Sequence, residues 1–330
     1  MTVRSILAMG FAATALVAAS ASASASAQPS THPAQITFHA DTLYPETASW
    51  SASQHAFFVS SVRHGTVGKL TLEGKYTPFI KDDKLVSSVG VLADDAHNTL
   101  WVCISDPGVG DRSSKTTQDK LAAVATYNET TGARRAYYPL DTLSQGAHFA
   151  NDVTLDDKGD AYVTDSFSPI IYKISADGKM SVFAKNALFG AGNGFNLNGI
   201  AWFPDHQDGF LIVGRYNTGD LFRVSVADPT KVSKVRLPEA LKGADGFHAL
   251  DARHMIVAQN LGVDRTLELV SDDGWKSAKI VKQLKSAMSM PTSATQVGND
   301  IYVLDSRLDT LFDPKATKVS DFMLQRFPRR

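Results

Sequence analysis

The chain of 330 residues carries 33 Lys and Arg against 34 Asp and Glu, so its formal net charge is −1. A nearly neutral chain excludes a strongly basic nucleic-acid binder, and we expect no nucleic-acid partner. Apolar residues at 43% and charged residues at 20% are typical of a globular protein and exclude a disordered one. The single cysteine, Cys103, can form neither an internal disulfide nor a thiolate zinc site.

The first 27 residues have the pattern of a cleavable signal peptide. Arg4 precedes an apolar stretch at 6–19, and an Ala-Ser-Ala sequence ends at Ala27. The alternative is a membrane anchor, which needs about 20 apolar residues, but this run turns to alternating Ala and Ser too early. We therefore expect an exported protein, periplasmic or secreted, without a membrane span. A polar tail at 28–34 should precede the folded domain at 35–330.

A repeated pattern of short apolar strands and acidic turns fills the rest of the chain. The copy that begins at Asn151 reads NDVTLDDKGDAYVTDSFSPIIYKIS, and the copy that begins at Asn198 reads NGIAWFPDHQDGFLIVGRYNTGDLFRVS. Each contains a strand, an Asp/Gly turn, a second strand, a polar loop and a third strand. Fainter copies begin at Ser49, Val89, Ala244 and Pro291. Six copies of three or four strands, at about 40–50 residues each, predict an all-β, six-bladed β-propeller.

Some segments lie outside the regular repeat. We expect the extra strand at 35–40 to pair with the last blade and close the ring, which removes an exposed sheet edge. Helix should be limited to one turn at 237–242. The second copy contains a polar insertion at 106–120, which either overhangs the mouth of the channel or forms a solvated loop. We expect the domain to be a monomer.

Equivalent repeat positions predict a cluster of oxygen ligands, because the innermost strands of all blades lie beside the central channel at one height. Asn151, Asn198 and Asp245 stand 47 residues apart at the same repeat position. Thr292 occupies the same repeat position in the sixth copy. Glu46 precedes the first copy and lies within reach of the same part of the central channel. Carboxylate and amide oxygens suit Ca²⁺ and Mg²⁺, whereas soft metals require Cys or His. The alternative is ordinary turn chemistry, since Asn-Asp, Asn-Gly and Asp-Gly pairs also form turns before strands.

Four motifs carry a resemblance to a known family. They are Tyr44-Pro45-Glu46 with Trp50, Asn151-Asp152-Val153 with Tyr162-Val163-Thr164-Asp165, Asn198-Gly199-Ile200, and Ala244-Asp245-Gly246. Spread over 42–305, they resemble those of the gluconolactonase/regucalcin (senescence marker protein) family of six-bladed propellers. The resemblance implies a divalent metal held by Glu46, Asn198 and Asp245. Calcium is the first candidate, with zinc, manganese or magnesium as alternatives. The resemblance also implies that Asn151 contacts the substrate.

The sequence departs from the resembling family at Phe149. Many sugar-lactone hydrolases of that family carry an Arg two residues before the substrate-contacting Asn, but here this position is Phe149, preceded by His148. An aromatic ring cannot replace the forked donors of a guanidinium, so we expect a less polar lactone or ester than gluconolactone. We assign Phe149 and His148 to substrate binding. A structural role for His148 is the alternative, because neighbouring residues on a strand point to opposite faces.

Two classes of function are compatible with these residues. The absence of G-x-S-x-G, Walker, G-x-G-x-x-G and H-E-x-x-H sequences disfavours serine hydrolases, nucleotide binding and zinc proteases. The first class is an exported metal-dependent hydrolase of a lactone or related ester, in which the metal activates water in the central channel. Asp245 would take the proton of the water, and Asn151 would orient the substrate. The second is a non-catalytic propeller that binds a ligand or a protein and contains a structural metal.

Overall fold

The chain divides into two units, Met1–Thr31 and His32–Arg330. In this computed structural model the residues described are 1–2, 32–190, 192, 194–206 and 208–328. The expected signal peptide, beyond its first two residues, and the first part of the expected polar tail, 28–31, lie outside the described residues. No helix within the described segments is both long and apolar enough to cross a membrane.

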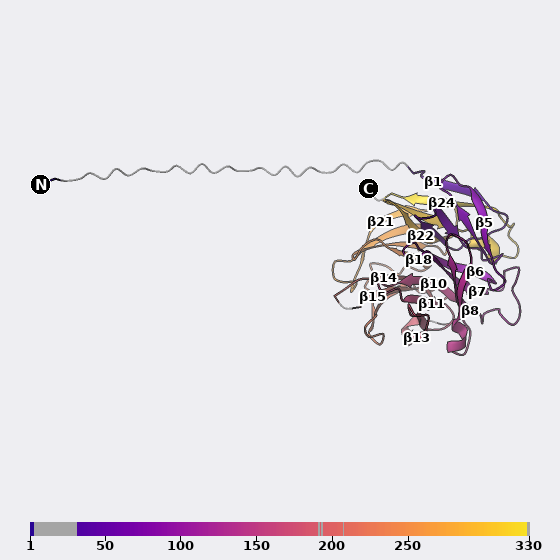
Figure 1. Ribbon diagram of the computed structural model, residues 1–330, viewed down its shortest axis with the longest axis horizontal. Coiled ribbons are helices and arrows are strands. Elements are labelled where there is room, and N and C mark those ends of the chain that lie inside the picture. Colours follow the sequence, from indigo (N-terminus) through magenta and orange to yellow (C-terminus); the bar gives the residue numbers. More distant parts are fainter. Residues whose placement is uncertain (3–31, 191, 193, 207, 329–330) are drawn as a thin grey trace. The chain divides into compact units, whose positions relative to one another are not determined.

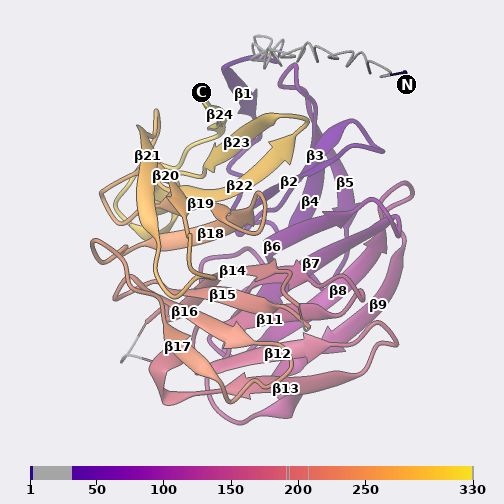
Figure 2. The same ribbon diagram turned by 90° about the vertical axis from the view of Figure 1, so that its left-hand side faces the viewer.

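The unit His32–Arg330 is a six-bladed β-propeller, as the repeat predicted (Figures 1 and 2). Its described residues form six four-stranded antiparallel sheets, and the innermost strands of neighbouring sheets contact one another around a closed circle. The strands of blades 1 to 3, in order, are β2 (Ala48–Ser51), β3 (Ala56–Val59), β4 (Thr66–Leu70), β5 (Tyr76–Lys81), β6 (Ser87–Asp94), β7 (Thr99–Ser105), β8 (Ala122–Asn128), β9 (Arg134–Pro139), β10 (Ala150–Leu155), β11 (Ala161–Asp165), β12 (Ile170–Ile174) and β13 (Met180–Lys185).

Blades 4 and 5 follow the same order, from the innermost strand outward, and blade 6 takes its outermost strand from the start of the chain. Their strands are β14 (Leu197–Phe203), β15 (Phe210–Arg215), β16 (Asp220–Ser225), β17 (Val232–Lys234), β18 (Ala244–Ala249), β19 (His254–Gln259), β20 (Arg265–Val270), β21 (Lys279–Lys285), β22 (Pro291–Val297), β23 (Asp300–Asp305), β24 (Asp321–Phe327) and β1 (Gln35–His39).

The first strand closes the ring. β1 pairs antiparallel with β24, with Ile36 opposite Leu324, and Figure 2 shows the two strands side by side. The expected closure is therefore confirmed. The residues just before β1 also contact blade 6, since the Tyr302 hydroxyl donates to the Pro33 carbonyl at 2.5 Å and the Arg326 amide donates to the Ala34 carbonyl at 2.9 Å. The end of the expected polar tail is thus attached to the propeller.

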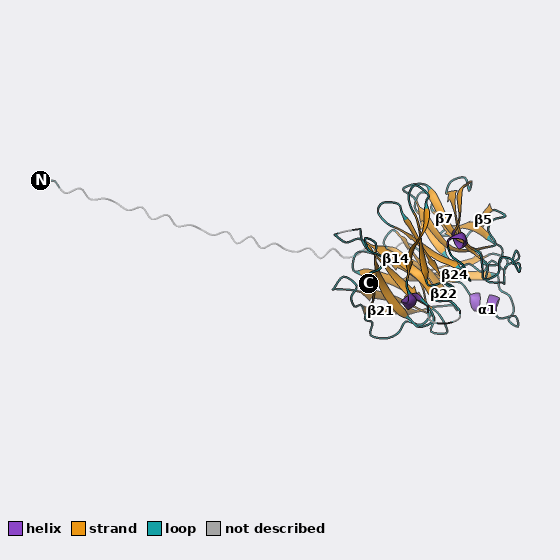
Figure 3. Ribbon diagram, turned by 90° about the horizontal axis from the view of Figure 1, so that it is seen from below, coloured by secondary structure: helices purple, strands orange, loops and turns teal. Residues whose placement is uncertain are grey.

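Helix is scarce in the described residues but does not lie where the sequence predicted (Figure 3). The expected turn at 237–242 is wrong, because the amides around it bond elsewhere: Leu241 donates to the Gly219 carbonyl at 2.9 Å. Pro238 in this segment has no amide to donate. Short helical segments occur instead at η1 (Leu140–Leu143), η2 (Ala187–Phe189) and α1 (Leu308–Phe312).

The core lies between the faces of adjacent blades. Tyr302 of blade 6 packs edge-on against Phe57 of blade 1 with ring centroids 5.8 Å apart, and both rings are fully buried. Phe203 of blade 4 likewise contacts Trp275 of blade 5 at 4.8 Å. Alternate residues of each strand therefore face a neighbouring blade, which fixes the height of one blade relative to the next.

Candidate functional site

Asn151, Asn198, Asp245 and Thr292, called here the ring residues, occupy one structural position in four successive blades. Each lies where the pairing of the innermost strand with the second strand is irregular. In β10, for example, Ala150 and Val153 pair regularly and Asn151 falls between them. A bulge of this kind redirects a side chain out of the regular alternation. The register inferred from the 47-residue spacing is therefore a real structural equivalence.

Glycines hold the innermost strands close together beside the ring residues. A Cβ atom on Gly199 would lie 2.0 Å from the carbonyl oxygen of Asp245, and one on Gly246 would lie 2.4 Å from that of Thr292. Gly90 stands in the same relation to Asn151, at 2.4 Å. Only a residue without a side chain allows this approach between backbones. The ring residues of adjacent blades are consequently neighbours, although they are far apart in the sequence.

Gly199→Ala should destabilise the protein by about 1–3 kcal/mol, because the added methyl group has no space next to the Asp245 carbonyl. The free energy of unfolding in urea measures this loss. Gly190→Ala is the matched control, since its Cβ would meet only Pro169 at an ordinary 3.6 Å and its φ of −102° suits alanine. Equal stability of the two variants would show that blades 4 and 5 do not pack this closely.

The ring residues present four buried oxygen atoms without a hydrogen-bond partner. These are Oδ1 of Asn151, Oδ1 of Asn198, Oδ1 of Asp245 and Oγ1 of Thr292, all on side chains that are at most 5% exposed. Buried polar atoms in native proteins nearly always have a partner, so each exception requires an explanation. Four such atoms at equivalent positions of four blades indicate a place where something else binds.

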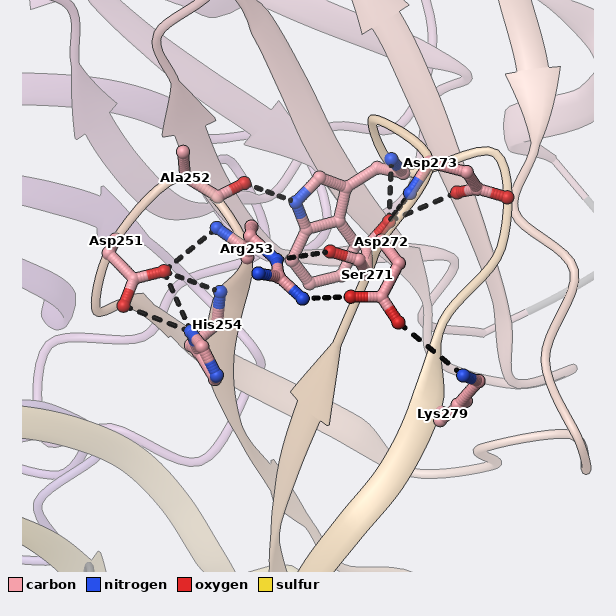
Figure 4. Close-up of polar contacts among 9 residues, drawn as sticks. Asp251, Ala252, Arg253, His254, Ser271, Asp272, Asp273 and Lys279 are labelled. Atoms are coloured by element: carbon pink, nitrogen blue, oxygen red, sulfur yellow. Dashed lines mark hydrogen bonds and ion pairs between the residues drawn. The ribbon is translucent and has the colours of Figure 1, made fainter.

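Polar groups elsewhere in the same blade satisfy one another. At the end of blade 5 away from Asp245, Asp251 accepts from the amides of Arg253 and His254 at 2.8 and 3.0 Å (Figure 4). The Arg253 guanidinium pairs with Asp272, which also accepts from Lys279. The far end of blade 5 is thus satisfied by its own side chains, in contrast to the ring residues.

Glu46 and Asp152 add two carboxyl groups to this place. Glu46, 8% exposed, accepts from the Thr47 hydroxyl at 2.6 Å. Burial raises the pKa of Glu46, and repulsion from Asp245 and then Asp152 raises it further. The three carboxyl groups are therefore near enough for their charges to repel one another. Sequence reasoning had included Glu46 and Asp245 but not Asp152, which stands at the repeat position that glycine occupies in blades 2, 4 and 5.

The three carboxyl groups lack compensating positive charge. Burial raises the pKa of Asp152 to about 7. It raises the pKa of Asp245 to about 8, with a contribution from Asp152, while the amides of Asn260 and Asn198 act in the opposite direction. No cationic side chain among the described residues contributes to either shift or to that of Glu46. Buried carboxylates without a cation are costly, so this place favours a positively charged ligand.

No group of three or more His, Cys, Asp or Glu side chains in the described parts of the chain is placed to hold a metal ion. A cation bound here would therefore depend on amide and hydroxyl oxygens as well as carboxylates. Cys103 is disfavoured as a ligand, because metals bind the thiolate. It is fully buried, and burial raises the pKa of its thiol, with repulsion from Asp152 and Glu46 in addition.

A second set of residues at equivalent positions forms hydrogen bonds with Glu46 and with the ring residues. Ser60, Ser166 and Asn260 each follow the end of the second strand of their blade. The Ser166 hydroxyl donates to the Leu197 carbonyl at 2.5 Å, so it accepts from Nδ2 of Asn151 at 2.9 Å and leaves Oδ1 of that amide free. The Ser60 hydroxyl accepts from the Glu46 amide at 3.1 Å. The hydrogen bonds of Ser166 thus determine that Oδ1 of Asn151 stays unpartnered.

Asn260 and Tyr216 form a chain of hydrogen bonds that ends on Asp245. Nδ2 of Asn260 donates to Oδ2 of Asp245 at 2.6 Å and to the Pro291 carbonyl at 3.2 Å. The Tyr216 hydroxyl donates to Oδ1 of Asn260 at 2.6 Å. Tyr216 therefore fixes the orientation of the Asn260 amide, and Asn260 holds one oxygen of Asp245 while the other has no partner.

His148 is engaged in a buried ion pair. Its Nδ1 lies 2.7 Å from Oδ2 of Asp165, and its Nε2 lies 3.0 Å from the Ser144 carbonyl. Both partners are acceptors, an arrangement that favours the imidazole with both ring nitrogens protonated. Burial acts to lower the pKa of His148, but the hydrogen bond and charge of Asp165, with smaller contributions from Ser144 and Asp141, raise it. These contacts favour the structural role for His148 over substrate binding.

The charged His148–Asp165 pair should make the fold less stable as the pH rises. Because the pKa of His148 is raised in the folded state, its stabilisation is complete below about pH 6.5 and is lost as the pH rises through the folded pKa. We expect the free energy of unfolding to fall more between pH 6 and 9 in the wild type than in His148→Gln. His39→Gln, which removes an exposed pair with Asp321, serves as the control. If the free energy of unfolding falls equally with pH in wild type and His148→Gln, the pair is neutral.

Phe149 lies beneath other aromatic rings. It is 4% exposed and packs against Phe167 at 5.2 Å and Phe195 at 5.1 Å between ring centroids. Its amide donates to Oδ1 of Asp165 at 3.0 Å. Phe149 is therefore close to Asn151 in the chain but is covered by Phe167 and Phe195, both of which are only partly buried.

The insertion at 106–120 packs against blade 1 at the end of the ring where the ring residues lie. Asp106, fully buried, accepts from the hydroxyls of Ser113 and Thr117 at 2.5 and 2.6 Å. Arg112 donates to the carbonyls of Asp82 and Leu85 at 2.9 and 2.7 Å. The insertion is therefore a structured loop that is tied to its neighbours by its own polar groups.

Comparison with known proteins finds no match to a protein-family model or to a curated protein, but many to solved structures. The Malassezia sympodialis allergen Mala s 1 aligns with a TM-score of 0.70 and 18% identity over 90% of this chain and 99% of the allergen. A gluconolactonase from Xanthomonas campestris aligns with a TM-score of 0.60 and 13% identity over 89% of each chain. A calcium-binding regucalcin from Agrobacterium tumefaciens aligns at 0.58 and 14% over 89% and 93%.

The fold is that of the gluconolactonase and regucalcin propellers. At these identities the alignments establish the fold, and they confirm the resemblance inferred from the motifs at that level. Within this propeller, sequence reasoning missed Asp152, Asn260 and Tyr216. A signal for Asn260 was present, because it stands 94 residues after Ser166, twice the 47-residue repeat. Tyr216 occupies the same position in blade 4 but departs from that spacing, because the first two strands and the turn between them are each longer there than in blade 3.

Proposed function

We propose that the protein is a metal-dependent hydrolase of a lactone or related ester, with its active site at the ring residues. The observation that carries the proposal is the set of four buried, unpartnered oxygens, one of them on Asp245, with the further carboxyl groups of Glu46 and Asp152 and no cation. The gluconolactonase from Xanthomonas campestris, which has the same fold, supports the class of reaction.

A hard divalent cation fits the donors that are present. The unpartnered atoms are amide, carboxylate and hydroxyl oxygens, which Ca²⁺ and Mg²⁺ prefer. Glu46, Asn198 and Asp245 would hold the ion, and two carboxylates would balance its charge. Because nitrogen and sulfur donors are lacking in this set, calcium, magnesium or manganese suits it better than zinc.

A bound cation would supply Lewis-acid polarisation of the acyl carbonyl of the substrate. Side chains of the protein would accept the proton and return it. As water attacks the acyl carbon, the carboxylate of Asp245 takes the proton of the water, while Asn260 fixes the orientation of this carboxylate through Oδ2. The acyl C–O bond then breaks, and the proton passes to the departing oxygen. Oδ1 of Asn151 is turned away from Ser166 and would accept a hydrogen bond from the substrate or a water.

A non-catalytic propeller that binds a ligand or protein is the second candidate. The observation that favours it is the allergen Mala s 1, which aligns at a higher TM-score than the gluconolactonase and is not named for a reaction. In that case the cation would have only a structural role and would hold the ring residues in position.

A panel of lactones and aryl esters, assayed with and without a chelator, distinguishes the two functions. The hydrolase should turn over at least one lactone, lose this activity with chelator and regain it when Ca²⁺, Mg²⁺ or Mn²⁺ is added. Metal bound by elemental analysis, with no turnover of any substrate, would favour the binding propeller and contradict the hydrolase.

We also propose that the protein is exported to the periplasm or the medium and acts as a monomer. Export rests on the sequence pattern of residues 1–27. The monomer is supported by the pairing of β1 with β24, because blade 6 is completed by a strand of the same chain and needs none from a second chain. Cell fractionation and light scattering test the two statements.

A further inference from the structure

Three partly buried aromatic side chains stand together beside the candidate site. Phe167 and Phe195 contact each other with ring centroids 5.1 Å apart, and Phe195 contacts Tyr216 at 6.3 Å. Phe149 lies beneath the first two and is almost fully buried. We call Phe167, Phe195 and Tyr216 the aromatic wall. Each of these three residues is partly exposed.

The aromatic wall is attached to the residues that orient the site. Phe167 directly follows Ser166, whose hydroxyl holds Asn151. Phe195 directly precedes Asn196, whose amide donates to the Ser166 carbonyl at 2.8 Å and whose carbonyl accepts from the Tyr216 amide at 2.7 Å. Tyr216 in turn holds Asn260, and Asn260 holds Asp245. The wall therefore has a defined position relative to both ring residues.

Among the described residues next to these rings, the side chains of Ser166, Tyr216 and Asn196 already donate to other protein groups. The Ser166 hydroxyl donates to the Leu197 carbonyl, and the Tyr216 hydroxyl donates to Asn260. Nδ2 of Asn196 donates to the carbonyls of Ser166 and Gly194 at 3.3 and 2.9 Å. A hydroxyl-rich substrate placed here would lose water without gaining hydrogen-bond donors in return. A flat apolar ring would instead cover aromatic surface and stack or pack edge-on.

We propose that the aromatic wall binds a fused or attached aromatic ring of the substrate, so that the preferred substrates are aryl lactones or aryl esters. The inference rests on the proposed hydrolase function, whose substrate class it names. Phe167 and Phe195 are the specificity-determining residues, because Tyr216 is already engaged in orienting Asn260.

The matched pair of dihydrocoumarin and δ-valerolactone tests the wall. Both contain a six-membered lactone, and only dihydrocoumarin has a fused benzene ring. We expect Phe195→Leu and Phe167→Leu each to lower the ratio of kcat/KM for dihydrocoumarin over δ-valerolactone by about threefold to tenfold, the size of one aromatic contact. The intrinsic reactivities of the two lactones cancel when this ratio is compared between variants.

Phe79→Leu is the matched control. Phe79 is also partly buried and packs against one ring, Phe58, in blade 1 at 5.8 Å, and its replacement should leave the ratio unchanged. Phe195→Tyr keeps the ring and should retain the wild-type ratio, which separates loss of the aromatic contact from a folding defect. Thermal unfolding of all variants checks their stability.

Calorimetric titration with the lactam analogue of dihydrocoumarin, which resists hydrolysis, separates this inference from the proposed function. Binding that weakens in Phe195→Leu, without turnover of either lactone, would support the wall and contradict the hydrolase. Turnover with the same ratio in wild type and both leucine variants would support the hydrolase and overturn the wall. Neither turnover nor lactam binding would overturn both.

Discussion

Asp245→Asn is expected to abolish the response of the protein to divalent cations and to reduce lactone hydrolysis by about 10²–10⁴-fold. The substitution keeps the shape of the side chain but removes both a charged ligand and the proton acceptor. A cation at about 100 times its Kd should stabilise the wild type by about 2.7 kcal/mol and the variant by much less. Thermal unfolding with chelator and with added Ca²⁺, together with kcat/KM, measures both effects.

Without cation the Asp245→Asn variant should be at least as stable as the wild type. The carboxyl of Asp245 is buried beside Asp152 and Glu46, and an amide removes this repulsion. Asp272→Asn is the matched control, because Asp272 pairs with Arg253 and Lys279 at the exposed far end of the same blade (Figure 4). It should change neither activity nor the cation response. A cation response of wild-type size in Asp245→Asn would exclude the ring residues as the metal site.

Asn260→Ala is expected to destabilise the protein by about 3 kcal/mol and to weaken Ca²⁺ binding by about 10–100-fold. The change leaves the Tyr216 hydroxyl without its acceptor and deprives Asp245 and the Pro291 carbonyl of a donor, all inside the protein. Asp245 then loses the contact that fixes its orientation. Urea unfolding and calorimetric titration with Ca²⁺ measure the two losses.

Tyr216→Phe should have a smaller effect on both stability and Ca²⁺ affinity. It removes only the hydroxyl that orients Asn260, so stability should fall by about 1 kcal/mol and Ca²⁺ affinity by less than in Asn260→Ala. Asn128→Ala is the control, since Asn128 caps an exposed turn at the other end of blade 2. Unchanged Ca²⁺ affinity in both Asn260→Ala and Tyr216→Phe, despite the loss of stability, would show that these residues support the fold and not the site.

Much of this architecture could be predicted because a propeller repeats. The 47-residue spacing of Asn151, Asn198 and Asp245 survives as one bulge position in three blades, since equal register in repeated blades means equal height on the ring. The pairing of β1 with β24 could be foreseen for a related reason, because a strand left over from the repeat can pair only with the incomplete last blade.

By itself, the sequence determined the six-bladed fold, its closure and the ring residues, all of which follow from periodicity along the chain. Only the tertiary structure decided which groups act on them across blades. It brought Asp152 near enough to repel Glu46, and it linked Tyr216 through Asn260 to Asp245. It also paired His148 with Asp165 and packed Phe167 and Phe195 against Phe149. These contacts depend on loop paths and side-chain directions between different elements, and a repeat period contains no information about either.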